Sequence, residues 1–513
     1  GNGHRRARLY ADALTGDLKI REVTAKVKEK RDQDYLRVYG LVPLSKTNPE
    51  KDVLNRYEYL QQFKKESKEF GSMKQTSEAL AVVVALENLA RNAGYPDPVR
   101  LTWAMETKQV QSILSKDTQF TIEDTTIGLT IDKEGKADVV ALKDGKELKA
   151  IPAKFKKNPD VLELNKHRKV LREQWTRSKK GLEEAMIRGD VFSYSEIINL
   201  LEHPVIAKHL EKLVFISNED KIGFFIDGKL TSAKGEVFEA NDDTTFRIAH
   251  CYDLHKNNVW TDFQSYCFDN KLKQPFKQIF RELYVPTPDE LKEKSISRRY
   301  AGHQVHPKQT LALLKTRGWK VDYEEGLQKV FHKEGYQVKL YAMADWFSPA
   351  DVESPTLETI EFHSLKDYKN IPFEAVNPRL FSEVMRDIDL VVSVAHVGGV
   401  DPEASHSSIE MRSVLLRETL RLFKVKNVEI IENHALIEGT IAKYSVHLGS
   451  AIVHQIPGKY LSILPVQSQH RGRLFLPFAD DDPKSAEVMS KVLMLAKDNE
   501  IQDPTVLSQI DRK

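Results

Sequence analysis

The sequence has few cysteines and no long apolar run, and each absence excludes a class of protein. Only two of the 513 residues are cysteines, Cys251 and Cys267, so the chain has no disulfide framework and no CxxC or Cys/His spacing of a zinc site. The most apolar stretches, residues 79–86 and 390–397, are far shorter than the roughly 18 residues of a membrane-spanning helix. We therefore expect a cytoplasmic protein without a signal peptide, membrane segment, metal or cofactor.

The sequence also lacks a large net charge of either sign. Lys and Arg number 77 and Asp and Glu number 75, which gives a formal charge of +2 and disfavours a general polyanion binder. The charge is unevenly distributed, because residues 154–180 contain ten basic and three acidic side chains. With 30% charged and 41% hydrophobic residues, the composition is typical of a globular protein of several domains.

Residues 154–180 are predicted to form the first part of one long amphipathic helix with a basic face. Apolar side chains recur at helical spacing, namely Leu164, Leu171, Trp175, Leu182 and Met186. We interpret the basic face mainly as a solvated surface, because no aromatic residues are interleaved with the charges to stack on bases. The alternative is nucleic-acid binding that weakens steeply with salt, through four basic residues, Lys166, Arg168, Lys169 and Arg172.

The pattern predicts an α+β fold with a helical front and a mixed α/β rear. Residues 1–116 read as helices separated by glycine and proline. Because the chain starts at Gly1 directly in helical sequence, we expect this region to be the end of a longer helical-repeat segment. Apolar and polar residues alternate within 117–153, which predicts a small β-meander. An α+β domain with the basic helix is expected over 154–320, and a mixed α/β domain over 321–513.

Histidines are enriched near the end of the chain. Six of the sixteen lie between His396 and His470, but no HxH, HxxxH or HExxH spacing of metal ligands occurs, which favours ordinary hydrogen-bonded histidines. His447 and His454 would face opposite sides of an unbroken strand and meet only across a turn at 449–450. Ser445 shares a strand face with His447, but no third group is evident, so no nucleophile is assigned.

The segment 390–412 suggests an anion site. An apolar run at 390–395 predicts a buried strand, Gly398 and Gly399 would lie in a loop, and Ser407 and Glu410 have the spacing of a capping box that opens a helix. A strand, a glycine loop and a helix N-terminus can present backbone N–H groups to a phosphate. A plain connection between a strand and a helix is the favoured alternative.

A second basic and acidic cluster lies at 469–484. Arg471 and Arg473 could hold a phosphate, and three consecutive aspartates could hold Mg²⁺ beside it. Asp482 as a helix N-cap before Pro483 explains the same residues without any ligand and is favoured. An enzyme site would take one histidine as general base and combine six candidates, His396, His406, Glu410, Arg412, His447 and His470.

Seven stretches resemble a family of uncharacterised bacterial proteins. Those in the first group resemble the conserved domain of MolR-like and YehI-like proteins: HPVIAKHL (203–210), QPFKQ (274–278), RYAGH (299–303) and LKTRGW (314–319). Those in the second group are similar to the C-terminal domain that accompanies it: SVAHVGGVDPEASH (393–406), YSVHLGS (444–450) and SQHRGRLFLPFADDDP (468–483). The resemblance covers about residues 154–513.

The resemblance implies which proteins could be partners, but it implies no catalytic residues. Members are typically longer, with helical-repeat sequence and sometimes a WGR domain upstream. They lie in gene neighbourhoods with MoxR-type ATPases and von Willebrand A proteins, which implies a multi-protein stress or defence assembly. No catalytic residues are established for the family.

Three hypotheses follow. The first is an interaction or effector module of a large cytoplasmic bacterial protein, with protein partners. The second is a hydrolase or transferase that acts on a phosphate-containing substrate through the C-terminal histidines and arginines. The third is nucleic-acid binding by the basic helix. None of the three requires a membrane.

Overall fold

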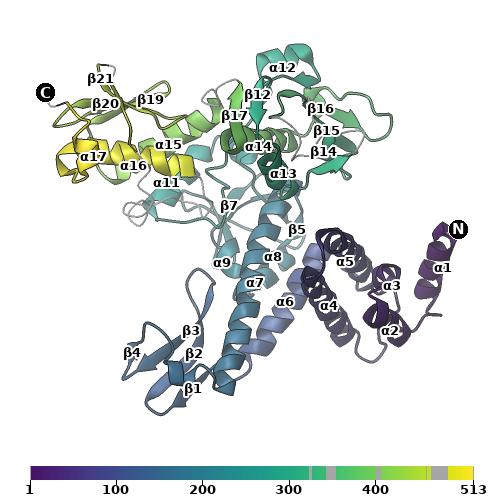
Figure 1. Ribbon diagram of the computed structural model, residues 1–513. Helices are drawn as coiled ribbons and strands as arrows, with labels where there is room; N and C mark the ends of the chain where they lie inside the picture. Colours follow the sequence, from purple (N-terminus) through teal and green to yellow (C-terminus); the bar gives the residue numbers. More distant parts are fainter. Residues whose placement is uncertain are drawn as a thin grey trace. The chain divides into compact units, whose positions relative to one another are not determined.

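The computed structural model describes residues 2–322, 326–342, 354–399, 406–457, 459–463 and 483–511. The chain divides into two compact units (Figure 1). Unit 1 is Gly1–Gly181 with Ile198–Lys208, and unit 2 is Leu182–Ile197 with His209–Lys513. Each unit is described by itself. The finer boundaries at 116, 153 and 320 stay a prediction.

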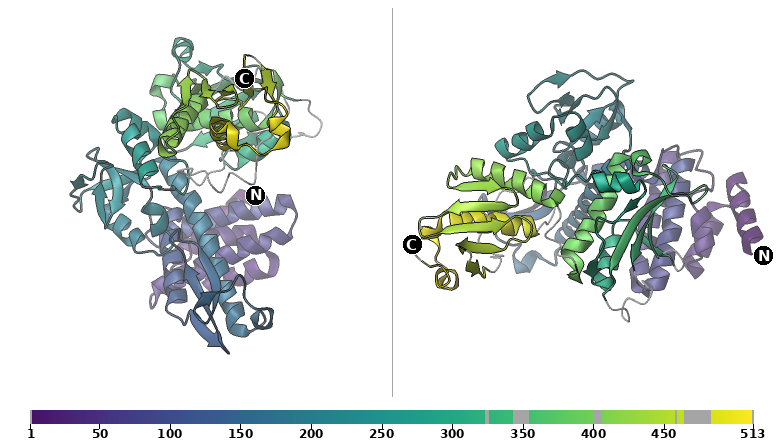
Figure 2. Two further views of the ribbon diagram at one scale, coloured as in Figure 1. Left: turned by 90° about the vertical axis from the view of Figure 1, so that its left-hand side faces the viewer. Right: turned by 90° about the horizontal axis from the view of Figure 1, so that it is seen from above.

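Unit 1 begins with helices packed side by side (Figure 2). They are α1 (Asn2–Thr15), α2 (Ile20–Lys30), α3 (Gln33–Val38), α4 (Pro49–Glu66), α5 (Ser72–Asn92) and α6 (Pro98–Leu114). Asn48 and Asp97 cap the two helices that start with proline, because their side chains accept backbone N–H groups of the first turn. The core between the helices is apolar and includes Val27, Leu60 and Leu89.

A four-stranded antiparallel meander follows in unit 1, as the alternation predicted. Its strands are β1 (Gln119–Ile122), β2 (Thr125–Ile131), β3 (Ala137–Lys143) and β4 (Lys146–Glu147), in sequence order. The inner face packs on α6 and on α7 (Pro159–Arg188) through side chains such as Val110, Ile127, Val139 and Leu171. The α7 residues after Gly181 belong to unit 2.

In its described residues, unit 2 contains three antiparallel sheets of five or six strands, with helices against them, and one two-stranded pair. The first has the order β5-β10-β6-β7-β8-β9, and α10 (Cys251–Lys256) and α11 (Trp260–Asp269) contribute to the core beside it. Its strands are β5 (Phe192–Ser193), β6 (Val214–Ser217), β7 (Ile222–Ile226), β8 (Lys229–Thr231), β9 (Val237–Phe238) and β10 (Thr245–Ile248). The short helices α8 (Tyr194–Leu201) and α9 (Ala207–Leu210) lie between β5 and β6 in the sequence.

The second sheet has the order β11-β16-β15-β14-β13 and packs against α13 (Pro307–Lys315) and α14 (Pro378–Ala395). Its strands are β11 (Ile296–Ser297), β13 (Lys320–Asp322), β14 (Gly326–Phe331), β15 (Tyr336–Ala342) and β16 (Leu357–Ser364). Helix α12 (Pro288–Glu293) precedes it. A separate pair joins β12 (His303–Val305) to β17 (His396–Gly399).

The third sheet is a five-stranded meander, β18 to β22 in sequence order. Its strands are β18 (Val428–Ile431), β19 (His434–Glu438), β20 (Lys443–His447), β21 (Val453–Ile456) and β22 (Lys459–Leu461). One face packs on α15 (His406–Leu422) and α16 (Pro483–Ala496), and α17 (Pro504–Leu507) follows. The buried Asp498 carboxylate fixes the β19–β20 turn, because it accepts the backbone N–H groups of Thr440, Ile441 and Ala442.

The α+β prediction is confirmed, but the strand predicted at 390–395 is wrong. These residues are the last turns of α14. Leu380, Val384 and Ile388 precede them at helical spacing, and neither glycine nor proline separates the two parts. The last six residues of α14 read as an apolar run because Ser393 is the only polar residue among them. Gly398 and Gly399 pair with β12 as part of β17, so they lie in a strand and not in the predicted loop.

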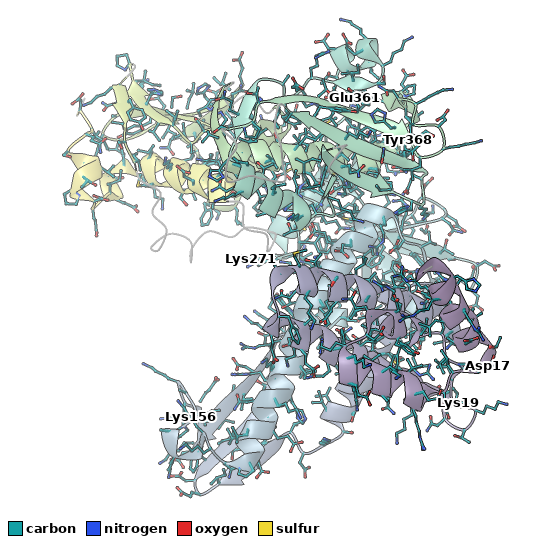
Figure 3. The ribbon with its side chains drawn as sticks, turned by 45° about the vertical axis from the view of Figure 1, so that its right-hand side comes forward. Asp17, Lys19, Lys156, Lys271, Glu361 and Tyr368 are labelled. Carbon is teal, nitrogen blue, oxygen red and sulfur yellow. The ribbon has the colours of Figure 1, made fainter. Side chains whose placement is uncertain are left out.

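The surfaces of both units are polar, with charged side chains projecting from them, including Lys19 and Lys156 (Figure 3). Across the described ranges, none of the helices has the length and apolar character needed to cross a bilayer.

Candidate functional site

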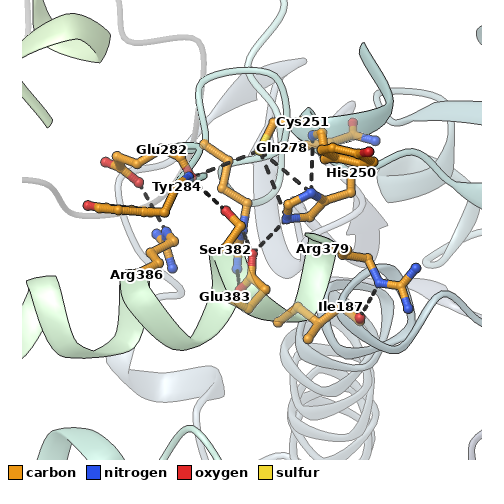
Figure 4. A network of polar contacts seen from close by, with 12 residues as sticks. Ile187, His250, Cys251, Gln278, Glu282, Tyr284, Arg379, Ser382, Glu383 and Arg386 are labelled. Carbon is orange, nitrogen blue, oxygen red and sulfur yellow. Dashed lines mark hydrogen bonds and ion pairs between the residues drawn. The ribbon is translucent and has the colours of Figure 1, made fainter. Parts of the chain in front are cut away.

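A buried polar cluster in unit 2 surrounds one face of α14. Asn377 caps this helix and Pro378 starts it. Arg379, Ser382, Glu383 and Arg386 follow at spacings of three and four residues, which places them on one face. Figure 4 shows this face directed toward His250 and the chain around Gln278 to Tyr284.

Glu383 is the centre of the cluster. The Arg281 guanidinium donates two parallel hydrogen bonds to its carboxylate, at 2.6 and 2.7 Å, and His250 Nε2 lies 2.8 Å from Oε1. Arg281 also reaches Glu183 at 2.9 Å. All three central side chains are at most 2% exposed. A fork of this kind is the strongest common ion-pair geometry in proteins.

The flanking contacts connect α14 to further segments. Arg386 donates to Glu282 at 3.0 Å, and Ser382 Oγ accepts the Tyr284 N–H at 3.0 Å. Arg379 donates to the carbonyl oxygens of Ile187 and Arg188 at 2.6 and 2.9 Å, which belong to the last turn of α7. The cluster therefore joins α14 to both the end of α7 and the chain after α11.

Electrostatics explains how such charges remain inside. Burial alone would raise the pKa of Glu383, but the adjacent Arg281 and His250 hold that pKa well below its usual range. Burial also lowers the pKa of His250 despite the carboxylate beside it. The imidazole is therefore neutral. His250 Nδ1 accepts the Tyr252 N–H at 3.1 Å, so Nε2 carries the proton that points to Glu383.

Cys251, His250 and Glu383 resemble a nucleophile, a base and an acid, but the environment of the thiol rules out that chemistry. Cys251 Sγ lies 3.7 Å from His250 Nδ1. The thiol is fully buried, and burial raises its pKa. A reactive cysteine needs an accessible thiolate. The α14 cluster is therefore structural, and sequence reasoning missed Arg281 and Glu383.

The candidate residues of the enzyme hypothesis lie in different places. His396 starts β17, where its ring centroid is 6.3 Å from that of His303, and Gly398 and Gly399 are in the same strand. His406 is the first residue of α15 and Glu410 is an exposed residue of it. Figure 1 shows β17 and the C-terminal sheet in separate parts of unit 2. His470, Arg471 and Arg473 lie outside the described residues.

Arg412 and His447 do meet, at the turn between β20 and β21. The buried Arg412 guanidinium donates to the carbonyl oxygens of Leu448 and Gly449, at 3.1 and 2.8 Å. Lys491 donates to the Ala451 carbonyl at 2.9 Å, and Lys484 lies 3.4 Å from the Ser450 carbonyl oxygen. Cations from α15 and α16 thus hold four consecutive carbonyl groups of the turn.

The outer side of the same turn carries a histidine and a serine. His447 Nδ1 lies 3.0 Å from Ser450 Oγ and accepts the Ser450 N–H at 3.1 Å. The His434 ring contacts His447 from the neighbouring strand, with centroids 4.8 Å apart. Because Nδ1 is the acceptor, the ring N–H lies at Nε2, and Nδ1 is the basic nitrogen that faces Ser450. Sequence reasoning considered Ser445 and missed Ser450.

His434, His447 and His454 share one face of the third sheet, since the strand register pairs His434 with His447 and Ser445 with His454. Within the part of the chain that the structure describes, no three His, Cys, Asp or Glu side chains are grouped closely enough to hold a metal ion.

The basic helix α7 uses two of its four candidate residues within unit 1. Arg168 and Arg172 pair with Asp138 of β3 at 3.3 and 2.9 Å, and Arg172 also donates to the Ala137 carbonyl. Lys166 and Lys169 are exposed. Ion pairs at the surface are weak, so all four side chains can still reorient toward solvent.

Comparison with known proteins finds three domains, each of unknown function. A family of unknown function (DUF5724) matches residues 1–105, a domain of unknown function (DUF4132) matches 145–319, and a domain of unknown function (DUF7737) matches 409–510. His250 and Arg281 fall in the second range, His447 and Ser450 fall in the third, and Glu383 lies between them. No curated protein matches the chain, and no solved structure does.

Proposed function

We propose that the chain is an interaction and effector module of a large cytoplasmic bacterial protein. The likeness of 203–210, 393–406 and 444–450 to MolR-like and YehI-like proteins supports this reading. By the same likeness, the partners are a MoxR-type ATPase and a von Willebrand A protein in a stress or defence assembly. We also propose that the chain is related to those members of the family that carry a WGR domain upstream.

The observation that carries the interaction role is an apolar stripe on α5. Met73, Leu80 and Val83 are 87%, 58% and 46% exposed. Their spacing of seven and three residues places them on one side of the helix. Thr76, also exposed, completes the stripe. Isolated exposed apolar residues are common, but a stripe at helical spacing is what a second helix packs against.

The opposite side of α5 is already used. Ala81, Val82, Ala85 and Leu89 are buried in the helical core of unit 1. Helix α5 therefore presents apolar side chains on two sides, although one side suffices to fold it. We assign the outer stripe to an amphipathic helix of the partner. This is the mode in which apolar anchors at positions i, i+3, i+7 and i+10 fill a complementary face.

Binding between purified proteins tests the proposal. The chain is titrated with the purified MoxR-type ATPase and with the von Willebrand A protein of its gene neighbourhood, and affinity is measured by interferometry. We expect one of them to bind, and the double substitution Leu80→Glu with Val83→Glu to weaken binding at least tenfold, since charges are introduced where apolar area is buried.

Gln111→Glu is the matched control, because Gln111 is an exposed residue of the neighbouring helix α6 and the change adds the same kind of charge. It should leave the affinity unchanged. If neither candidate partner binds, the proposed assembly is wrong. If the double variant binds as well as the original chain, α5 is not the interface.

A further inference from the structure

The β20–β21 turn is more strongly fixed than a hairpin turn requires. The Leu448, Gly449 and Ala451 carbonyls accept from the buried Arg412 and Lys491. Taking a cation out of water costs several kcal/mol unless its partners are well placed. Short hairpins ordinarily need only suitable turn residues. Two buried cations on one turn therefore indicate that its conformation itself matters.

The backbone of the turn shows a second sign of constraint. Ala451 adopts φ +62°, a left-handed conformation that is unfavourable for a non-glycine residue. The turn closes by hydrogen bonds from the Ala451 N–H to the His447 carbonyl and from the His447 N–H to the Ile452 carbonyl, both 2.9 Å. Strain that surrounding contacts maintain is frequent at functional sites.

The group that this turn positions is the Ser450 hydroxyl. Its Oγ lies 3.0 Å from the Nδ1 acceptor of His447, and it accepts the Ile452 N–H at 3.2 Å. The first contact is the geometry of a nucleophile with its general base. The second stabilises negative charge on Oγ. Both Ser450 and His447 are partly exposed, in contrast to the fully buried Cys251.

We propose that Ser450 is a nucleophile and His447 its general base, in an acyl-transfer site for carboxylic esters. This inference is independent of the α5 interface, since it rests on unit 2 alone. Ser450 Oγ forms a bond to the acyl carbon while its proton moves to His447 Nδ1. The ester C–O bond breaks, and the departing alcohol takes that proton. Water then attacks the acyl-serine, and its proton passes through His447 back to Ser450 Oγ.

The charges around the turn favour an uncharged ester over a phosphate. Arg412 and Lys491 direct donors to turn carbonyls, and Lys484 pairs with Glu487 at 3.0 Å. Among the described residues of the turn and its two helices, these cations are already neutralised or coordinated. A phosphate needs cations whose donors are still available. The phosphate-containing substrate of the second sequence hypothesis is therefore replaced by a carboxylic ester.

A fluorophosphonate probe tests the site on the full chain. Reaction forms a P–O bond to Ser450 and releases fluoride, and mass spectrometry of peptides locates the adduct. We expect one adduct per chain, on Ser450, and none in Ser450→Ala. His447→Asn keeps an acceptor at the Nδ1 position for the Ser450 N–H but cannot take a proton. It should label at least 100-fold more slowly, within the range of lost general-base catalysis.

Two controls make the result decisive. Ser445→Ala removes a hydroxyl from the same face of β20 and should label like the original chain. Thermal unfolding of each variant confirms that it is folded. Hydrolysis of p-nitrophenyl butyrate should follow the same pattern. A folded chain without an adduct on Ser450, or a His447→Asn variant that labels at the original rate, overturns the proposal. Turnover of p-nitrophenyl phosphate in place of the butyrate overturns the ester assignment.

Discussion

Unit 2 contains two polar clusters built from similar residues that use them in opposite ways. Around α14, Arg281, His250 and Glu383 satisfy one another and no central side chain reaches solvent. At the β20–β21 turn, the buried cations bind backbone carbonyls, and His447 and Ser450 remain partly exposed. A buried cluster of residues with shifted pKa values is therefore not sufficient evidence of a catalytic site. An accessible nucleophile beside an unprotonated acceptor is the more informative feature.

The largest effect is expected where the α14 cluster is broken on one side only. Glu383→Gln leaves the Arg281 charge without its main partner and should lower the free energy of unfolding by about 3–5 kcal/mol. Urea unfolding followed by fluorescence measures it. The double variant Glu383→Leu with Arg281→Met removes both charges and should lose less than the single variant. A single variant as stable as the original chain would mean that the cluster contributes nothing to folding.

A smaller loss is expected from the turn. Arg412→Met removes the donors to two carbonyl oxygens and should cost about 2 kcal/mol, because buried acceptors are left unsatisfied. The same variant should slow labelling of Ser450, whereas Glu383→Gln should not while the chain is folded. Arg417→Met is the control, since Arg417 is an exposed residue of the same helix. Equal stability of both arginine variants would contradict the role of Arg412.

The smallest effect concerns a feature that both clusters share, a histidine whose Nδ1 accepts a backbone N–H group. His203 in unit 1 is a third example, with the Val205 and Ile206 N–H groups at 3.1 and 3.2 Å. Burial lowers the pKa of His203 from 6.5 to about 4. Below pH 6.5 the unfolded chain gains a proton that the folded chain refuses, so stability falls as the pH decreases toward 4.

Because of that difference in proton uptake, the free energy of unfolding should be about 2 kcal/mol lower at pH 5 than at pH 7.5. His203→Asn keeps an acceptor for both N–H groups but does not titrate, so the unfolding free energy of this variant should fall by that much less over the same interval. Urea unfolding at the two pH values measures the difference. Parallel pH dependence of both chains would show that His203 is not held neutral in the folded chain.

The sequence predicted the fold class better than the site. Helices before residue 116, the meander after it and the strands of the last sheet follow from local periodicity, which short-range contacts enforce. The strand predicted at 390–395 fails because the polar residues that reveal the helical period of α14, such as Glu383 and Arg386, lie in its earlier turns, whereas its end is apolar apart from Ser393. Local pattern does not distinguish it from a buried strand.

The polar clusters depend on contacts that periodicity does not encode. Arg281 and Glu383 are 102 residues apart in the sequence, and neither belongs to a motif. His447 and Arg412 were chosen from the enrichment of histidine and arginine, and the structure brings them to one turn. The sequence does not predict the contact of Ser450 with His447, because that contact depends on the conformation of the turn. The alternation of a strand instead favours Ser445, which is two residues before His447 and on the same face.

One experiment compares the two clusters in the same folded molecule. The native chain is treated with a fluorophosphonate and with iodoacetamide, and the modified residues are identified by mass spectrometry. We predict a phosphonyl group on Ser450 and no alkylation of Cys251 or Cys267, whose burial raises their pKa values. Alkylation of Cys251 with Ser450 unmodified would contradict the account, in which the α14 cluster has a structural role and the β20–β21 turn a catalytic one.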